Sequence, residues 1–387
     1  MKKIPFYKPP ITINDYFEVF KTISSGWLTT GKRNFEFTKK LAEYLGIDER
    51  NVVLVSSCTA GLHLLFDAFE LKGKEIIVPA ITFISPVEMA LLVGATPTIV
   101  DVEYDYVTIS LEEVEKKISN KTGAVIPTYY GGNSYDRRVL EVANAKGIVS
   151  IEDAAHAFGT KVDGVKVGNV ERLGVDATVF SFYATKTLHT GEGGAVITSN
   201  EKVLDKIRKT RLHGMDHNAW SRYQNNLVGY DITEVGFKYN FPDVLASVGI
   251  AQLKVFGKMQ KERKRVWDLY FKYLSDLDTI RLPRIRENTE PSYHLFTIRL
   301  NTEMWSIDKL TFIKLLNDRG IGTSVHFTPI YRFTKYREIL KPDLSEFKNS
   351  EKIFREIVSL PIYPSLSNRE IEYICSVIWD LSKSYRR

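Results

Sequence analysis

The chain has 387 residues, 44% of them apolar, which is enough to bury a large core and argues against a disordered protein. Its formal charge of +6 is spread thinly, so it favours anionic ligands weakly and does not indicate a nucleic-acid-binding stripe. Cys58 and Cys375 are too few for a disulfide framework, and no secretory signal or apolar run of about 20 residues is present. We expect a cytoplasmic protein without a membrane or nucleic-acid partner.

From Asn51 to about His213, short apolar runs alternate with amphipathic runs of helical length. This pattern is typical of strands joined by crossover helices in a parallel sheet. The predicted strands are Val52 to Val55, Glu75 to Val78, Thr98 to Val102, Gly123 to Pro127, Gly147 to Ile151, Thr178 to Phe182 and Ala195 to Thr198. The predicted helices are Gly61 to Phe69, Pro86 to Leu92, Leu111 to Ile118 and Arg137 to Ala145.

The remaining chain predicts a smaller α+β domain. It opens with a long helix from Asp243 to about Leu277, whose basic run, Lys258 to Arg265, is interpreted as a solvated face. The further elements expected are a strand at His294 to Leu300, a helix at Lys309 to Arg319, a strand at Thr323 to Phe327 and a helix from Arg369 to about Ser384. We therefore expect an α/β protein with a large domain over residues 1–245 and a small one over 246–387.

The segment Ser181 to Gly194, S-F-Y-A-T-K-T-L-H-T-G-E-G-G, contains the first candidate for chemistry. Lys186 follows a buried strand, and the glycines behind it let backbone and ligand approach closely. A lysine that forms a Schiff base must lose its proton near neutral pH, which partial burial at the rim of a sheet favours. The alternative is a lysine that is buried or solvated without a function.

A second candidate is Asp153, within I-E-D-A-A-H-A-F-G at Ile151 to Gly159. It lies at the carboxyl end of a predicted strand, where open α/β sheets bind ligands, and a carboxylate there can pair with a protonated pyridine nitrogen. The alternative is a cap for the Ala-rich turn that follows.

A third candidate is S-S-C-T-A-G-L-H, Ser56 to His63, at a strand-to-helix junction. Hydroxyl residues at the start of a helix can bind a phosphate through free backbone N–H groups. An ordinary helix cap at Ser57 or Thr59 would look the same.

These segments, with others in the same order, closely resemble the DegT/DnrJ/EryC1/StrS family of sugar aminotransferases. The further matching motifs are S-G-W-L-T-T-G (Ser25 to Gly31), P-A-I-T-F (Pro79 to Phe83), G-A-T-P (Gly94 to Pro97), R-L-H-G-M (Arg211 to Met215), G-F-K-Y-N (Gly236 to Asn240) and G-I-G-T-S-V-H-F (Gly320 to Phe327). The resemblance implies the type I, aspartate-aminotransferase-like fold, with a mostly parallel mixed sheet. It also implies pyridoxal 5'-phosphate (PLP) as cofactor, which alternates with its pyridoxamine form, and no metal.

By this resemblance, Lys186 forms the Schiff base and moves the proton, and Asp153 pairs with the ring nitrogen. Phe83 matches the aromatic residue that stacks on the ring, although a core role is the commoner fate of Phe. The remaining residues that match cofactor contacts are Thr59, Ala60, Ser181 and His156. Asn240 matches a residue that reaches the phosphate of the neighbouring subunit, so a homodimer with shared active sites is implied; a turn role is its alternative.

The resemblance also implies L-glutamate as the amino donor and a nucleotide-linked keto-sugar as the acceptor. The run His213 to Tyr223 and the run Val325 to Phe327 are similar to members that aminate carbon 4 of a UDP-sugar in surface-polysaccharide synthesis. The residues assigned to the substrate pocket are Trp27, Thr30, Trp220, Arg222 and His326. His213 and His326 are equally open to a structural role.

Three positions depart from the family pattern: Cys58 replaces a glycine or alanine, Ala184-Thr185 replaces a proline-bearing pair, and Pro242 follows Phe241. None removes a charged or nucleophilic group. A subgroup with histidine in place of the lysine removes a hydroxyl, and Lys186 argues against that activity. The alternatives left are amination at carbon 3, a PLP enzyme of amino-acid metabolism and a non-catalytic regulator.

Overall fold

The structure is a computed structural model that describes residues 3–216, 220, 223 and 229–387. Within these residues, a seven-stranded sheet has the order β1-β9-β8-β5-β4-β2-β3. Its strands are β1 (Val52–Val55), β2 (Glu75–Pro79), β3 (Thr96–Val100), β4 (Thr122–Val125), β5 (Val149–Asp153), β8 (Ala177–Ser181) and β9 (Gly194–Ile197). Only β9 runs antiparallel to its neighbours β1 and β8, so the predicted, mostly parallel mixed sheet is confirmed.

Helices pack on the main sheet, and two separate apolar clusters fill the space between helices and strands. The helices of this part are α2 (Lys32–Leu45), α3 (Cys58–Ala68), α4 (Ser85–Leu92), α5 (Leu111–Lys117), α6 (Arg138–Ala145), α7 (Val170–Leu173) and α8 (Glu201–Thr210). Helix α1 (Ile13–Ser24) lies apart from the sheet and packs on the long helix described next. The strands are almost wholly apolar and buried, as expected for strands covered on both faces.

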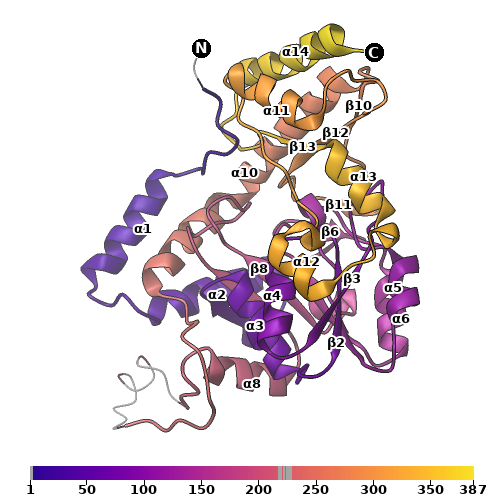
Figure 1. Cartoon of the computed structure of the whole chain (residues 1–387). Helices are drawn as coiled ribbons and strands as arrows, with labels where there is room; N and C mark the ends of the chain where they lie inside the picture. Colours follow the sequence, from indigo (N-terminus) through magenta and orange to yellow (C-terminus); the bar gives the residue numbers. More distant parts are fainter. Residues whose placement is uncertain (1–2, 217–219, 221–222, 224–228) are drawn as a thin grey trace.

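The long helix α10 (Asp243–Leu274) joins the main sheet to the C-terminal part, contacting α1 and α2 as well as α14 (Figure 1). The C-terminal part has the sheet order β10-β12-β13 and its own apolar cluster. Its elements are β10 (Ile280–Arg281), β12 (Phe296–Leu300), β13 (Ile357–Leu360), α11 (Lys309–Asp318), α12 (Thr334–Leu340), α13 (Lys348–Glu356) and α14 (Asn368–Tyr385). A small sheet of β11 (Thr289–Glu290), β6 (Lys161–Val162) and β7 (Val165–Lys166) completes the fold. Because α10 runs through both parts, the boundary at residue 245 stays a prediction.

Two expectations about this region were wrong. Residues 323–327 do not form a strand: only Ser324 bridges to Ser359, and the third strand of the sheet is β13. The carbonyl of His326 instead accepts a hydrogen bond from the Tyr130 hydroxyl, and the chain then lines a cavity. The basic run on α10 is not wholly solvated, because Arg263 is fully buried.

The helices of the described residues were also compared with the length and apolarity that a bilayer crossing needs. None of them meets both requirements.

Candidate active site

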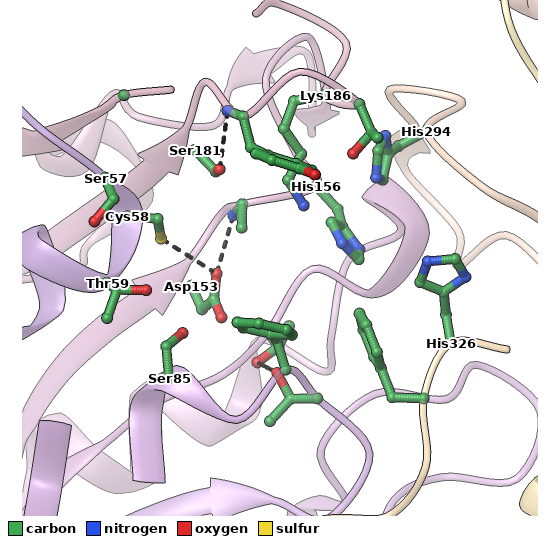
Figure 2. A pocket seen from close by; sticks show the side chains of 18 of the residues that line it. Ser57, Cys58, Thr59, Ser85, Asp153, His156, Ser181, Lys186, His294 and His326 are labelled. Carbon is green, nitrogen blue, oxygen red and sulfur yellow. Dashed lines mark hydrogen bonds between the residues drawn. The ribbon is translucent and has the colours of Figure 1, made fainter. Parts of the chain in front are cut away.

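A cavity of about 390 Å³ opens at the carboxyl edge of the main sheet. Residues that follow β1, β2, β4, β5 and β8 reach it, as expected for ligand sites in open α/β sheets. Residues from the C-terminal part form its other wall. Figure 2 shows the hydroxyl side chains of Ser57, Thr59 and Ser85 on one side, and the rings of His294 and His326 on the other.

Lys186 lies in the loop between β8 and β9 and lines this cavity. Its backbone N–H donates to the Tyr183 carbonyl at 2.9 Å, and the Tyr7 hydroxyl donates to the Lys186 carbonyl at 3.4 Å. Burial lowers the pKa of Lys186 to about 8, against the opposing charges of Asp153 and Cys58. The amine can therefore take up and release a proton near neutral pH.

Asp153 is the last residue of β5 and is only 3% exposed. Its Oδ1 accepts the backbone N–H of Ala155 at 3.0 Å and lies 4.0 Å from the Cys58 Sγ. Burial raises the pKa of Asp153, while the Ala155 N–H and Lys186 favour the charged form. The side chain caps a turn and not a helix, and it faces the cavity.

The first turn of α3 lies beside Asp153. Ser57 is the helix cap, because its Oγ accepts the backbone N–H of Ala60 at 3.0 Å, which fits the alternative raised from the sequence. A Cβ on Gly194 would lie 2.8 Å from the backbone nitrogen of Cys58, so only glycine lets β9 pack directly against this turn. Ser57, Cys58 and Thr59 line the cavity, where the start of a helix favours an anion.

Three neutral histidines form the opposite wall. His156 Nδ1 accepts the backbone N–H of Gly131 at 3.2 Å, and burial, Lys186 and His326 hold the pKa of His156 well below its usual range. The ring is therefore neutral, with its proton on Nε2. Burial also lowers the pKa of His326 to about 4, and its Nδ1 lies 2.8 Å from the Ser359 hydroxyl. His294 packs on His156 with ring centroids 4.4 Å apart.

The structure brings together seven of the residues chosen from the sequence: Lys186, Asp153, His156, Thr59, Phe83, Ser181 and His326. Phe83 is 56% exposed, so it is not a core aromatic. Ala60 is buried and not among the cavity-lining residues, and His213 is exposed and also absent from them. Arg222 lies outside the described residues.

The other four chosen residues lie away from this cavity. The Asn240 Nδ2 donates to the Thr30 Oγ1 at 2.9 Å, and both residues line a second cavity of about 420 Å³. Trp27 packs edge-on against Trp220, with ring centroids 4.8 Å apart.

Sequence reasoning missed part of the lining. These residues include Thr82, Ser85, Thr128, Tyr183, Glu192, His294 and Phe327. Tyr183 and Glu192 fall within the segment that surrounds Lys186 and could have been chosen on that ground. His294 is a single histidine before β12 and has no motif that points to a site.

Comparison with known proteins identifies the family. The sequence pattern of the DegT/DnrJ/EryC1/StrS aminotransferase family matches residues 11–379. The spore coat polysaccharide biosynthesis protein SpsC of Bacillus subtilis is 34% identical over 384 residues, 98% of this chain and 97% of SpsC. The chain thus belongs to this family, whose cofactor is PLP.

Solved structures agree with this assignment. PseC of Helicobacter pylori, an aminotransferase of pseudaminic acid biosynthesis, has a TM-score of 0.91 and 25% identity, over 99% of this chain and 100% of PseC. Spr1654 of Streptococcus pneumoniae, in its pyridoxamine phosphate form, has a TM-score of 0.90 and 29% identity, over 98% of this chain and 99% of Spr1654. These similarities confirm the predicted fold class and cofactor.

Proposed function

We propose that this aminotransferase moves the amino group of L-glutamate to carbon 4 of a UDP-linked 4-keto-sugar. The observation that carries transamination is the enclosure of an amine with a lowered pKa, Lys186, and a buried carboxylate, Asp153, in one cavity. The choice of carbon 4 and of a UDP-sugar rests on the resemblance of residues 213–223 and 325–327 to enzymes with that activity. Support for a sugar acceptor comes from the relatives named for polysaccharide and pseudaminic acid biosynthesis.

The side chains that line the cavity match the chemical groups of PLP one by one. The amine of Lys186 suits the aldehyde, the carboxylate of Asp153 suits a protonated pyridine nitrogen, and the exposed ring of Phe83 suits the face of the pyridine. The start of α3 with Thr59, together with Ser181, suits the phosphate. When bound, PLP withdraws electrons from the carbon that carries the transferred amino group.

Each residue has a separate task in this proposal. Lys186 would move the proton between the substrate carbon and the cofactor, away from the donor carbon in the first half-reaction and onto the acceptor carbon in the second, because its pKa of about 8 allows both states. Asp153 keeps the ring nitrogen protonated. His156, with its fixed Nε2 proton, offers a hydrogen-bond donor beside the cofactor.

A homodimer is part of the proposal. Helix α1 presents a row of exposed apolar side chains, which for a protein of this size indicates a contact surface. They are Ile13, Tyr16, Phe17, Phe20 and Ile23, each more than half exposed. Asn240 and Thr30 lie in a separate cavity from Lys186, so Asn240 of one subunit would serve the cofactor phosphate of its partner.

The substrate pocket would then draw on both subunits. We propose His326 from the subunit that holds the cofactor, and Trp27, Thr30, Trp220 and Arg222 from its partner. The two tryptophans already pack against each other, which supports a common role.

The test is conversion of a UDP-4-keto-sugar with L-glutamate as donor. We expect 2-oxoglutarate to form in equal amount, and NMR of the product to place the new amine on carbon 4. An amine on carbon 3 would replace the carbon-4 assignment, and a PLP absorbance band that stays unchanged on adding L-glutamate would favour a non-catalytic regulator.

A further inference from the structure

A further cavity, of about 670 Å³, lies next to the active-site cavity in the C-terminal part. Val325 and Thr328 line it, whereas His326 and Phe327, between them in sequence, line the active-site cavity. One four-residue segment thus separates the two cavities. The first turn of α11 and the end of α13 complete the lining.

Lys309 is the buried charge that lines this cavity of about 670 Å³. It is only 7% exposed, and its Nζ lies 4.0 Å from the centre of the Phe354 ring and donates to the Phe354 carbonyl. Among the described residues, no carboxylate pairs with Lys309. Burial and the neighbouring Arg332 both disfavour the ammonium form and lower the pKa of Lys309 to about 8.

The charges around Lys309 are mainly positive. The cationic residues that line the cavity are Lys309, Arg332, Arg355 and Arg387. Arg332 is paired with Glu351, whereas the exposed Arg355 donates to the backbone carbonyl of Glu351, lowers the pKa of that carboxyl and forms no ion pair among the described residues. Asp308 is the side-chain carboxylate in the described lining, and its Oδ1 caps α11 by accepting the Thr311 N–H at 2.8 Å.

We propose that this cavity binds a phosphate or diphosphate group between Lys309 and Arg355. A small dianion would supply the missing negative charge and receive charge-assisted hydrogen bonds from both side chains. The N-terminal end of α11, whose first turn lines the cavity, favours the same charge. The group could belong to a nucleotide-linked substrate or to a free inorganic anion, and the experiment below separates these sources.

The experiment is titration of the PLP-loaded protein with pyrophosphate by calorimetry at fixed ionic strength. Loading with PLP keeps the cofactor's own phosphate site filled. We expect Lys309→Met and Arg355→Met each to weaken binding about tenfold, equivalent to about 1.4 kcal/mol. The matched control is Lys352→Met, because Lys352 is exposed on the same helix α13 and does not line the cavity. Absence of binding, or equal binding by all variants, would overturn the proposal.

Proton uptake gives a second readout at Lys309. The other charged residues that line the cavity are Asp308 at the start of the same helix, Arg332 before α12, Arg355 on α13 and Arg387 after α14, and of these Arg332 lowers the pKa of Lys309. A bound anion raises the pKa of Lys309, so at pH 8.5 binding of sulfate, which does not titrate there, should take up protons. Calorimetry in two buffers of different ionisation enthalpy measures the number of protons taken up. We expect Lys309→Met to lose this uptake, and an unchanged uptake in the variant would place the anion elsewhere.

Kinetics then distinguish the two sources. If the diphosphate of the substrate occupies the cavity, Lys309→Met raises KM for the keto-sugar nucleotide and leaves kcat nearly unchanged. If a free anion occupies it, KM stays constant, and the variant only loses its response to added pyrophosphate. The calorimetric result needs no keto-sugar, so it stands or fails separately from the proposed transamination.

Discussion

Glu152 and Asp153 are consecutive carboxylates on β5 whose side chains point to opposite faces of the main sheet. Asp153 lines the active-site cavity. Glu152 is fully buried on the other face, where it accepts hydrogen bonds from Arg137 Nη1 at 2.6 Å and from Tyr129, Tyr135 and Thr178. Because successive side chains of a strand point to opposite faces, the structural carboxylate of Glu152 is separated from that of Asp153, which faces the active-site cavity.

Glu152→Gln should destabilise the fold. The substitution leaves the half-buried Arg137 without its counter-charge and replaces an acceptor oxygen with an NH₂ group, so we expect a loss of about 3 kcal/mol in the free energy of unfolding. Urea denaturation measures it. An unchanged transition midpoint would show that the network adds nothing to stability.

Asp153→Asn should instead reduce turnover while the fold keeps its stability. The neutral amide cannot hold a protonated pyridine nitrogen, so we expect kcat to fall by at least about tenfold, or 1.4 kcal/mol. Steady-state kinetics beside urea denaturation separate the two effects. Glu152→Gln is the matched comparison, since it makes the same chemical change one residue earlier.

Lys186→Ala should strongly reduce turnover without unfolding the protein. Loss of the proton-transferring amine is expected to cost on the order of 10²- to 10⁴-fold in kcat. Added methylamine should restore part of the rate, a rescue that a purely structural lysine would not give. Lys202→Ala, at an exposed position, is the control, and full activity of Lys186→Ala would refute the proposed mechanism.

The capture of PLP by the apoprotein should depend on pH through Lys186. Only the neutral amine attacks an aldehyde, so the rate should rise about tenfold per pH unit below the lysine pKa and level off above it. With the pKa at about 8, the plateau begins near pH 8. Asp153 raises this pKa, so Asp153→Asn should move the plateau to lower pH; a shift to higher pH contradicts the assignment.

Acidic substitutions on the exposed face of α1 should disrupt the proposed dimer. Phe17→Asp with Phe20→Asp places charges on side chains that are 59% and 69% exposed, so the folded subunit should tolerate them. Light scattering after gel filtration should show a monomer, and an aminotransferase assay of that monomer should show little activity. Leu92→Asp, at a 69% exposed site on α4 that lines none of the three cavities described above, is the control and should remain dimeric.

The apolar patterns were sufficient to predict most of the main sheet. Strand β1 is placed at Val52–Val55 as expected, and the other predicted strands are displaced by one or two residues. The failure at residues 323–327 has a different cause. That segment has the composition of a strand, but its hydrogen-bond partners are Ser359 and Tyr130, which are distant in sequence. No local pattern reveals them.

Some active-site residues could likewise be inferred from the sequence, and others could not. Lys186, Asp153 and Thr59 follow strands, so their common edge could be inferred from strand order in sequence. His294 comes from the C-terminal part more than 100 residues after Lys186, and only packing brings it against His156. Trp27 and Thr30 could be chosen by resemblance, but their separation from the cavity of Lys186 could not be foreseen; for Asn240 the resemblance to a residue that serves the neighbouring subunit implied that separation.

The α/β class, the family, Lys186 and Asp153 could be inferred from the chain alone, because periodicity and short motifs are local properties. Only the folded chain shows which side chains surround Lys186, how far burial lowers the pKa of that lysine, and that Lys309 has no carboxylate partner among the described residues. These properties depend on burial and on neighbours distant in sequence, and both exist only after the chain has folded.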